Sequence, residues 1–155
     1  MTHIKNILIK VSGDLGETQK FYDFTVDKAK DSFVVVISGA GGQINAALEK
    51  AGYQIRFDEL HGRITETWEE RKIARDILEV EEKKLQDKFV GKGVAVMAPI
   101  LNARSVLCHI NGDNLVKALY LGFEEIYVFT LKDRLEAKKE IFKEWPKVEI
   151  IGIWK

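Results

Sequence analysis

The sequence has one cysteine, no net charge and no long apolar run, and each of these features excludes some classes of protein. A single cysteine, Cys108, among 155 residues excludes an intrachain disulfide and a cysteine-rich zinc site, so we expect a reducing, cytoplasmic location. Basic and acidic residues both number 24, so no net charge attracts nucleic acid or an anionic membrane. No apolar run approaches the length of a membrane span. We therefore expect neither nucleic acid nor membrane as a partner.

Hydrophobic residues are plentiful, at 46%, and we expect one domain over residues 1–155. Short apolar runs alternate with helical segments, which is typical of an α/β three-layer sandwich with a mainly parallel sheet. The first strand is predicted from the apolar run 7–9 and the residues 10–13 that follow it. Further strands are predicted at 33–37, 93–97, 106–110, 125–130 and 148–153, with a weaker one at 53–57. Helices are predicted at 17–31, 42–50, 67–89, 111–121 and 133–144.

The helix predicted at 67–89 is the longest. Thr67 with Glu70 fits a capping box at its start, and acidic and basic residues fill the face opposite its apolar stripe. These charges are typical of a solvated face. A helix of this length could also be a subunit contact, and we expect a homodimer or higher oligomer.

The most informative stretch is 33–45, which reads FVVVISGAGGQIN. Five apolar residues without alternation predict a strand buried on both faces. Gly39, Gly41 and Gly42 let the backbone approach a ligand, and the helix that follows offers unpaired N–H groups and the positive end of its dipole. The pattern indicates an anion site, although such turns also serve only to tighten a strand–helix crossover.

Polar clusters follow three of the predicted strands. They lie at 10–13, 38–42 and 111–113. In open parallel sheets, ligands bind beyond the carboxyl ends of the strands. If these strands are neighbours, the three clusters meet at one rim and form a site for a small acidic metabolite, a carboxylate or a phosphate.

Four short segments occur in an order that resembles a known family. They are the strand and lysine–glycine turn at 7–13, the glycine turn at 34–45, Arg-Ile-Thr at 63–65 and His-Ile-Asn-Gly-Asp at 109–113, with the strand 126–130 following. Together they resemble the amino acid kinase family, which includes acetylglutamate kinase and uridylate kinase. The resemblance implies an ATP-dependent phosphotransferase, with ATP and Mg²⁺ as cofactors and a carboxylate or phosphate acceptor.

The resemblance also implies roles for individual residues. Lys10 and Asp113 would be catalytic, Lys10 at the transferred phosphoryl group and Asp113 holding the catalytic lysines. Phosphoryl transfer depends on such positioning and positive charge. Gly13, Gly39, Gly41, Gly42, Arg63 and Asn111 would bind the substrate. Lys10, Ser12 and Thr130 would bind the cofactor, and no residue is assigned to a metal.

Parts of the family pattern are altered or lacking. The family's Thr-Asp-x-x-Gly turn appears here as Thr130-Leu131-Lys132-Asp133-Arg134, and the nucleotide-binding C-terminal half is expected to be largely missing. The second catalytic lysine has no clear counterpart, since Lys132, Lys138 and Lys139 are only nearby. A non-catalytic module that binds a small molecule or serves assembly is therefore the alternative.

Several conspicuous residues have simpler explanations. An unpaired lysine is costly to bury, which favours a functional Lys10, but an ion pair would also account for it. Asp113 could be a helix N-cap. His61 and His109 could be acid–base groups by residue type, yet both are expected to be structural. Cys108, inside an apolar run, is expected to be a buried, inert thiol.

Overall fold

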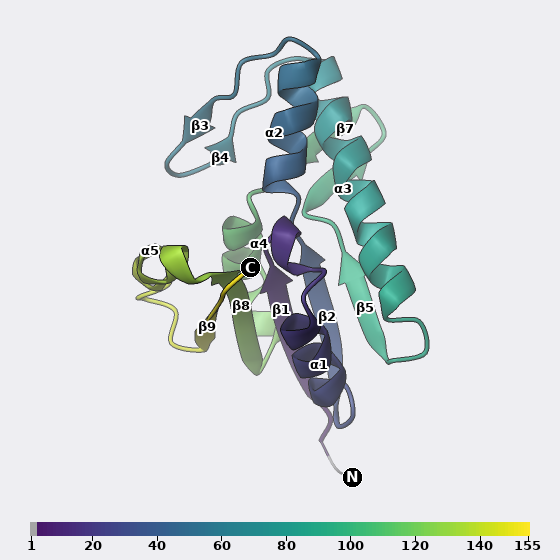
Figure 1. The fold of residues 1–155 in the computed structure, drawn as a ribbon, viewed down its shortest axis with the longest axis vertical. Helices are drawn as coiled ribbons and strands as arrows, with labels where there is room; N and C mark the ends of the chain where they lie inside the picture. The colour runs from purple at the N-terminus through teal and green to yellow at the C-terminus, as the bar shows by residue number, and fades with distance from the viewer. Residues whose placement is uncertain (1–2) are drawn as a thin grey trace.

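Apolar runs form a central parallel sheet. In the computed structural model, which describes residues 3–155, five strands pair in the order β5-β2-β1-β8-β9, and every pair is parallel (Figure 1). Their bounds are β1 Lys5–Val11, β2 Ser32–Ser38, β5 Val94–Met97, β8 Glu125–Leu131 and β9 Val148–Ile153. Helices cover both faces of the sheet, so the predicted α/β three-layer sandwich is confirmed.

Each face of the sheet has its own apolar core. Helix α1 (Gln19–Lys28) and the end of α3 (Trp68–Lys88) cover one face, where Phe21 and Leu85 belong to the same buried cluster as alternate residues of β1 and β2. Helices α4 (Gly112–Ala118) and α5 (Leu135–Ile141) lie on the other. The alternation of β1 explains the two cores, because Ile7, Ile9 and Val11 point to the first and Leu8 to the second.

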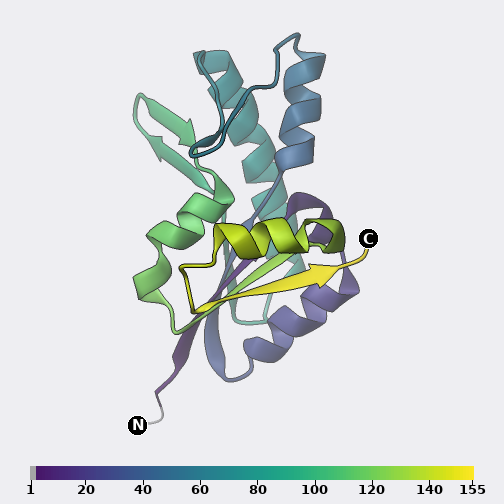
Figure 2. The same ribbon diagram turned by 90° about the vertical axis from the view of Figure 1, so that its left-hand side faces the viewer.

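A third cluster lies above the carboxyl ends of the strands. Helix α2 (Gly41–Lys50) packs there against the first half of α3 through Ile44, Leu48, Ala74 and Leu78. Figures 1 and 2 show both helices rising beyond the sheet. The capping box at the start of α3 is confirmed, since Thr67 Oγ1 accepts the Glu70 N–H at 3.1 Å and Glu70 accepts the Thr67 N–H at 2.7 Å.

Two antiparallel hairpins stand outside the sheet, and they correct several predictions. The strand predicted at 53–57 is reduced to β3 (Phe57–Asp58), which pairs with β4 (Gly62–Arg63). The predicted strand 106–110 is β7 (Val106–His109), but it pairs with the unpredicted β6 (Ile100–Ala103) instead of joining the sheet. Because this hairpin projects from the core, Cys108 is exposed and not buried as predicted.

The two edge strands of the sheet, β5 and β9, differ in how their outward backbone groups are hydrogen-bonded. At β5, the Gln86 side-chain amide makes hydrogen bonds of the kind that a neighbouring strand would make. Its Nε2 donates to the Val94 carbonyl at 3.0 Å, and its Oε1 accepts the Val96 N–H at 2.9 Å. At the opposite edge, Figure 2 shows β9 in front with α5 above it. Unpaired edges invite strand addition, and of the two edges β9 is the one left open to it.

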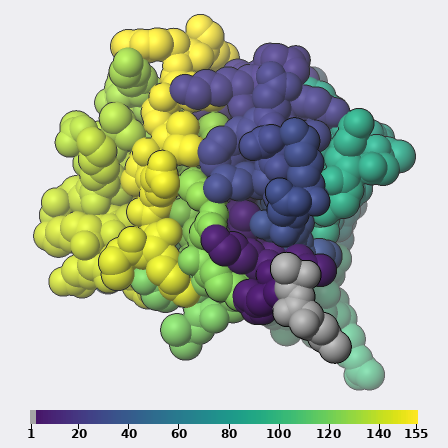
Figure 3. Space-filling model, turned by 90° about the horizontal axis from the view of Figure 1, so that it is seen from below, coloured from purple at the N-terminus to yellow at the C-terminus, as the bar shows by residue number. Residues whose placement is uncertain are grey.

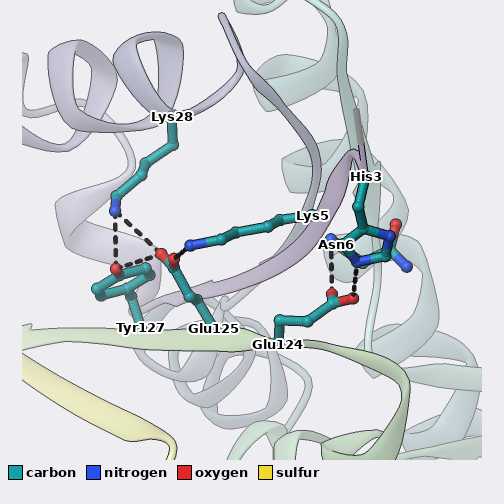
Figure 4. Close-up of polar contacts among 7 residues, drawn as sticks. All are labelled: His3, Lys5, Asn6, Lys28, Glu124, Glu125 and Tyr127. Carbon is teal, nitrogen blue, oxygen red and sulfur yellow. Dashed lines mark hydrogen bonds and ion pairs between the residues drawn. The ribbon is translucent and has the colours of Figure 1, made fainter. Parts of the chain in front are cut away.

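An ion cluster ties β8 to β1 and α1 at the amino ends of the strands (Figure 4). The Glu125 carboxylate accepts from Lys5 at 2.7 Å, Lys28 at 3.1 Å and the Tyr127 hydroxyl at 2.7 Å. These donors lower the pKa of Glu125 to about 2, the Lys5 hydrogen bond contributing most. The cluster therefore favours the folded state at neutral pH.

Within residues 3–155, no helix is both long and apolar enough to cross a membrane.

Candidate functional site

A cleft of about 530 Å³ opens at the carboxyl ends of the strands. It lies where the strand order reverses around β1, with β2 on one side and β8 on the other. This is the position at which open α/β sheets hold ligands. Four basic and two acidic side chains line it: Lys10, Arg63, Arg134, Lys138, Asp14 and Asp113.

The start of α2 forms one wall of the cleft. Gly39, Gly41 and Gly42 all line it, and Ala40, the N-cap residue of this ten-residue helix, makes no side-chain hydrogen bond to the helix start. A Cβ on Gly39 would lie 2.7 Å from the Val11 carbonyl oxygen, so only glycine lets the turn pack this closely on β1. A Cβ on Gly42 would meet nothing within 4 Å. Gly39 therefore has a packing role, while Gly41 and Gly42 leave the helix start accessible.

Arg63 is fixed beside this helix start. Its guanidinium donates to the Gly41 carbonyl at 3.0 Å and to Asn45 Oδ1, and it stacks on the Phe57 ring at 5.0 Å from the ring centroid. Burial lowers its pKa from the ordinary value, but an arginine stays charged at neutral pH. The β3–β4 hairpin thus positions a permanent positive charge at the cleft.

Opposite α2, one carboxylate lies between two lysines. Asp113 Oδ2 accepts a hydrogen bond from Lys138. Asp113 Oδ1 forms an ion pair with Lys10 Nζ at 3.4 Å and has no hydrogen-bond partner within residues 3–155. Lys10 is 8% exposed and Asp113 7%. Burial lowers the pKa of Lys10, while the two lysines together hold the pKa of Asp113 below its usual value although burial alone would raise it.

Glycine and asparagine residues around α4 shape this arrangement. Gly112 leaves room for the Lys10 stem, since a Cβ there would lie 2.9 Å from Lys10 Cε. Asn111 is the N-cap of α4, accepting the N–H groups of Asp113 at 3.0 Å and Asn114 at 3.1 Å. Asp113 is therefore not the cap, and its carboxylate remains free to pair with the lysines.

His109 lines the cleft from the end of β7. Its Nδ1 is buried and has no hydrogen-bond partner among the described residues. Burial and the nearby charge of Arg63 lower its pKa, so the ring is neutral at about pH 7. It can therefore offer a hydrogen bond to an uncharged polar group of a ligand.

Residues of the three polar clusters do line one cleft, but the cluster at 111–113 follows β7 of a hairpin and not a strand of the sheet, so only the first two clusters meet in the way that the sequence predicted. Most residues predicted for the site line the cleft: Lys10, Ser12, Gly13, Gly39, Gly41, Gly42, Arg63, Asn111 and Asp113. Thr130 does not, because its side chain is fully buried within β8. His61 is outside the cleft and pairs with Asp58 at 2.7 Å in the β3–β4 turn.

The lining residues that the sequence did not assign to the site include three with amide or basic side chains. Asn45 lies one turn into α2, Arg134 lies just before α5, and Lys138 lies within it. The helical spacing from Gly41 could have indicated Asn45. Lys138 is 25 residues from Asp113, and no local pattern connects the two.

Comparisons with known proteins bear on the fold. No family model matches the chain, and no curated protein matches it. A crystal structure of N-acetylglutamate synthase from Neisseria gonorrhoeae, complexed with coenzyme A and L-arginine, is similar, with a TM-score of 0.59 and 11% sequence identity. The similarity covers 96% of this chain and 56% of that one, so the chain spans little more than half of the synthase chain. At this identity the likeness shows the α/β fold alone.

These comparisons overturn the assignment to the amino acid kinase family. No family or curated match supports it, and the similar structure is a synthase complexed with coenzyme A and L-arginine. The family assignment and the ATP and Mg²⁺ cofactors are therefore wrong, and phosphoryl transfer has no support. The physical reason is that the four segments are short, and glycines and polar residues at strand ends are features of the parallel α/β fold itself.

Proposed function

We propose that this protein binds a small acidic metabolite, which places a carboxylate or phosphate group in the cleft between α2 and the Lys10 ammonium. The single observation that carries the proposal is the state of Lys10. It is buried at the cleft, and the counter-ion oxygen beside it, Asp113 Oδ1, accepts no hydrogen bond from it. An ammonium has three donors, so an arriving anion can be held there.

The surroundings of Lys10 support an anionic ligand. Asp113 already accepts a hydrogen bond from Lys138, so its negative charge stays paired when Lys10 binds an anion. Arg63 and the start of α2 face the same cleft and favour negative charge. Burial strengthens such interactions because little water competes for the donors.

His109 adds an uncharged hydrogen-bonding group to the cleft. The His109 ring is neutral, and its Nδ1 has no partner within the described chain. The N-acetylglutamate synthase structure contains coenzyme A and L-arginine, and both compounds carry anionic groups. They belong in the panel of test ligands beside simpler anions. The proposed role is binding, and it requires no reaction.

A thermal-shift panel tests this function. Inorganic phosphate, acetate, glutarate, L-arginine and coenzyme A are added at millimolar concentration to the wild type, to Lys10→Met and to Lys83→Met. Lys83 is exposed on α3 and serves as the matched control. We expect at least one anion to raise the melting temperature of the wild type and the control, with the affinity about tenfold or more lower in Lys10→Met. Absence of any shift in the folded wild type would refute the proposal.

A further inference from the structure

The open edge of the sheet at β9 differs from the covered edge at β5. The Gln86 side chain hydrogen-bonds one carbonyl and one N–H group of β5, those of Val94 and Val96. In the part of the chain from residue 3 onward, no side chain hydrogen-bonds the backbone of β9. Figure 3, seen from below, shows the yellow C-terminal residues at the surface, beside α5. Alternate residues of β9 therefore present N–H and C=O groups to a further strand.

The sequence of this edge is complementary to itself. Residues 149–155 read EIIGIWK, and they pair about Gly152 when the segment is laid antiparallel on a copy of itself. Glu149 then lies opposite Lys155, Ile150 opposite Trp154 and Ile151 opposite Ile153. Directly opposite residues interact across antiparallel strands, and pairs of opposite charge and apolar pairs both stabilise them.

We propose that β9 pairs antiparallel with β9 of a second copy of this chain, about a two-fold axis through Gly152, so that the two sheets become one. Each interface would contain the Glu149–Lys155 pair and the Ile150–Trp154 pair twice. Trp154, 72% exposed in the single chain, would be covered by the partner. The symmetry makes the contact closed, as in most homodimers.

Side chains at this edge already lie on the faces that the pairing requires. Trp154 is on the α5 side, where Lys132 Nζ is 5.2 Å from its ring centroid. Lys155 is on the opposite side, where it pairs with Asp14 at 3.3 Å. Ile150 packs in the core on the α5 side and Ile151 in the other core. The side chains thus alternate through to Lys155, two residues beyond the end of β9 at Ile153.

Charge also selects the register. Moving the axis by one residue to Ile151 would place Lys147 opposite Lys155 and leave Glu149 opposite Ile153. The axis at Gly152 instead gives every charged residue of 149–155 an opposite charge. The exposed face of α3 offers no comparable surface, since Trp68 and Val80 are its exposed large apolar residues and lie about three turns apart among charges.

Sedimentation equilibrium of the 155-residue chain tests the dimer, and charge exchange tests the interface. We expect Glu149→Lys to raise the dimer dissociation constant about tenfold, because it puts like charges opposite each other at two symmetric places. Combining it with Lys155→Glu restores the opposite charges, so the double variant should dimerise like the wild type. Glu49→Lys, an exposed charge reversal on α2, is the control and should change nothing.

Cysteine cross-linking locates the axis. With Cys108 replaced by serine, Gly152→Cys should form a disulfide-linked dimer under mild oxidation, whereas Glu49→Cys should not. Circular dichroism checks that each variant is folded. A chain that stays monomeric at all concentrations would overturn the proposal. So would a dimer that Glu149→Lys does not weaken, or a folded Gly152→Cys variant that forms no disulfide-linked dimer.

Discussion

Replacing Asp113 by asparagine removes the carboxylate that balances the buried Lys10. In the wild type, Asp113 pairs with Lys138 through one oxygen and faces Lys10 at 3.4 Å with the other. The side chains of Lys10 and Asp113 are each 10% exposed. The variant therefore leaves a positive charge in a place where water reaches it poorly.

The size of the effect follows from the burial. Removing one partner of a buried ion pair costs about 3–5 kcal/mol. Lys138, whose side chain is 17% exposed, can turn into the cleft when its partner is lost. We therefore expect Asp113→Asn to lower the free energy of unfolding by about 3 kcal/mol, the lower end of that range.

Urea unfolding at about pH 7 measures this loss, and a double variant tests its cause. Lys10→Met with Asp113→Asn removes both charges, so its stability should return to within about 1 kcal/mol of the wild type. The pKa of Asp113 is lowered by folding, so its contribution is present at neutral pH and fades below about pH 4. Additive losses in the double variant, or a difference that does not shrink in acid, would refute the reasoning.

Three further changes test a tight turn at the cleft, a helix cap and an ion cluster at the other end of the sheet. Gly39→Ala should lower the free energy of unfolding by about 1–3 kcal/mol, measured by chemical denaturation, because its Cβ would collide with the Val11 carbonyl. Gly42→Ala should leave the free energy of unfolding nearly unchanged. Equal losses in the two variants would contradict the packing role of Gly39. Thr67→Ala should lower stability by about 1 kcal/mol through the lost cap, and an unchanged melting temperature would count against it. Glu125→Gln should destabilise by about 1–2 kcal/mol at neutral pH, less than the full pKa shift implies because solvent screens the cluster. Since folding lowers the pKa of Glu125 to about 2, that difference is complete above about pH 4.5 and should shrink as pH falls toward 2; a pH-independent difference would be inconsistent with the cluster.

The sequence was informative where the signal is local. Short apolar runs indicated β1, β2 and β8, and Thr67 with Glu70 indicated the start of α3. The meeting of Lys10 with the glycine turn could be inferred from the rule that parallel strands end at a common rim.

Tertiary arrangement was not accessible in the same way. β7 pairs with β6 across the turn at 104–105, but an apolar run alone does not show whether it joins a local hairpin or the central sheet. Cys108 was therefore misplaced in the core. The contact of Lys138 with Asp113 depends on how α5 packs on the sheet, which no spacing in the sequence records.

Function was the hardest property to predict, because a short motif can be required by the packing of the fold as well as by ligand binding. Gly39 illustrates this, since the close approach of β1 requires a glycine there whether or not a ligand binds. Lys10 is the residue that packing explains least, since burying an ammonium is costly even beside a carboxylate.

The most direct test of anion binding at Lys10 is a calorimetric titration with the anion that gives the largest thermal shift, carried out on the wild type and on Lys10→Met. We expect one binding site per chain in the wild type and an affinity about tenfold or more lower in the folded variant. Equal affinity in the two proteins would contradict the claim that Lys10 holds the anion.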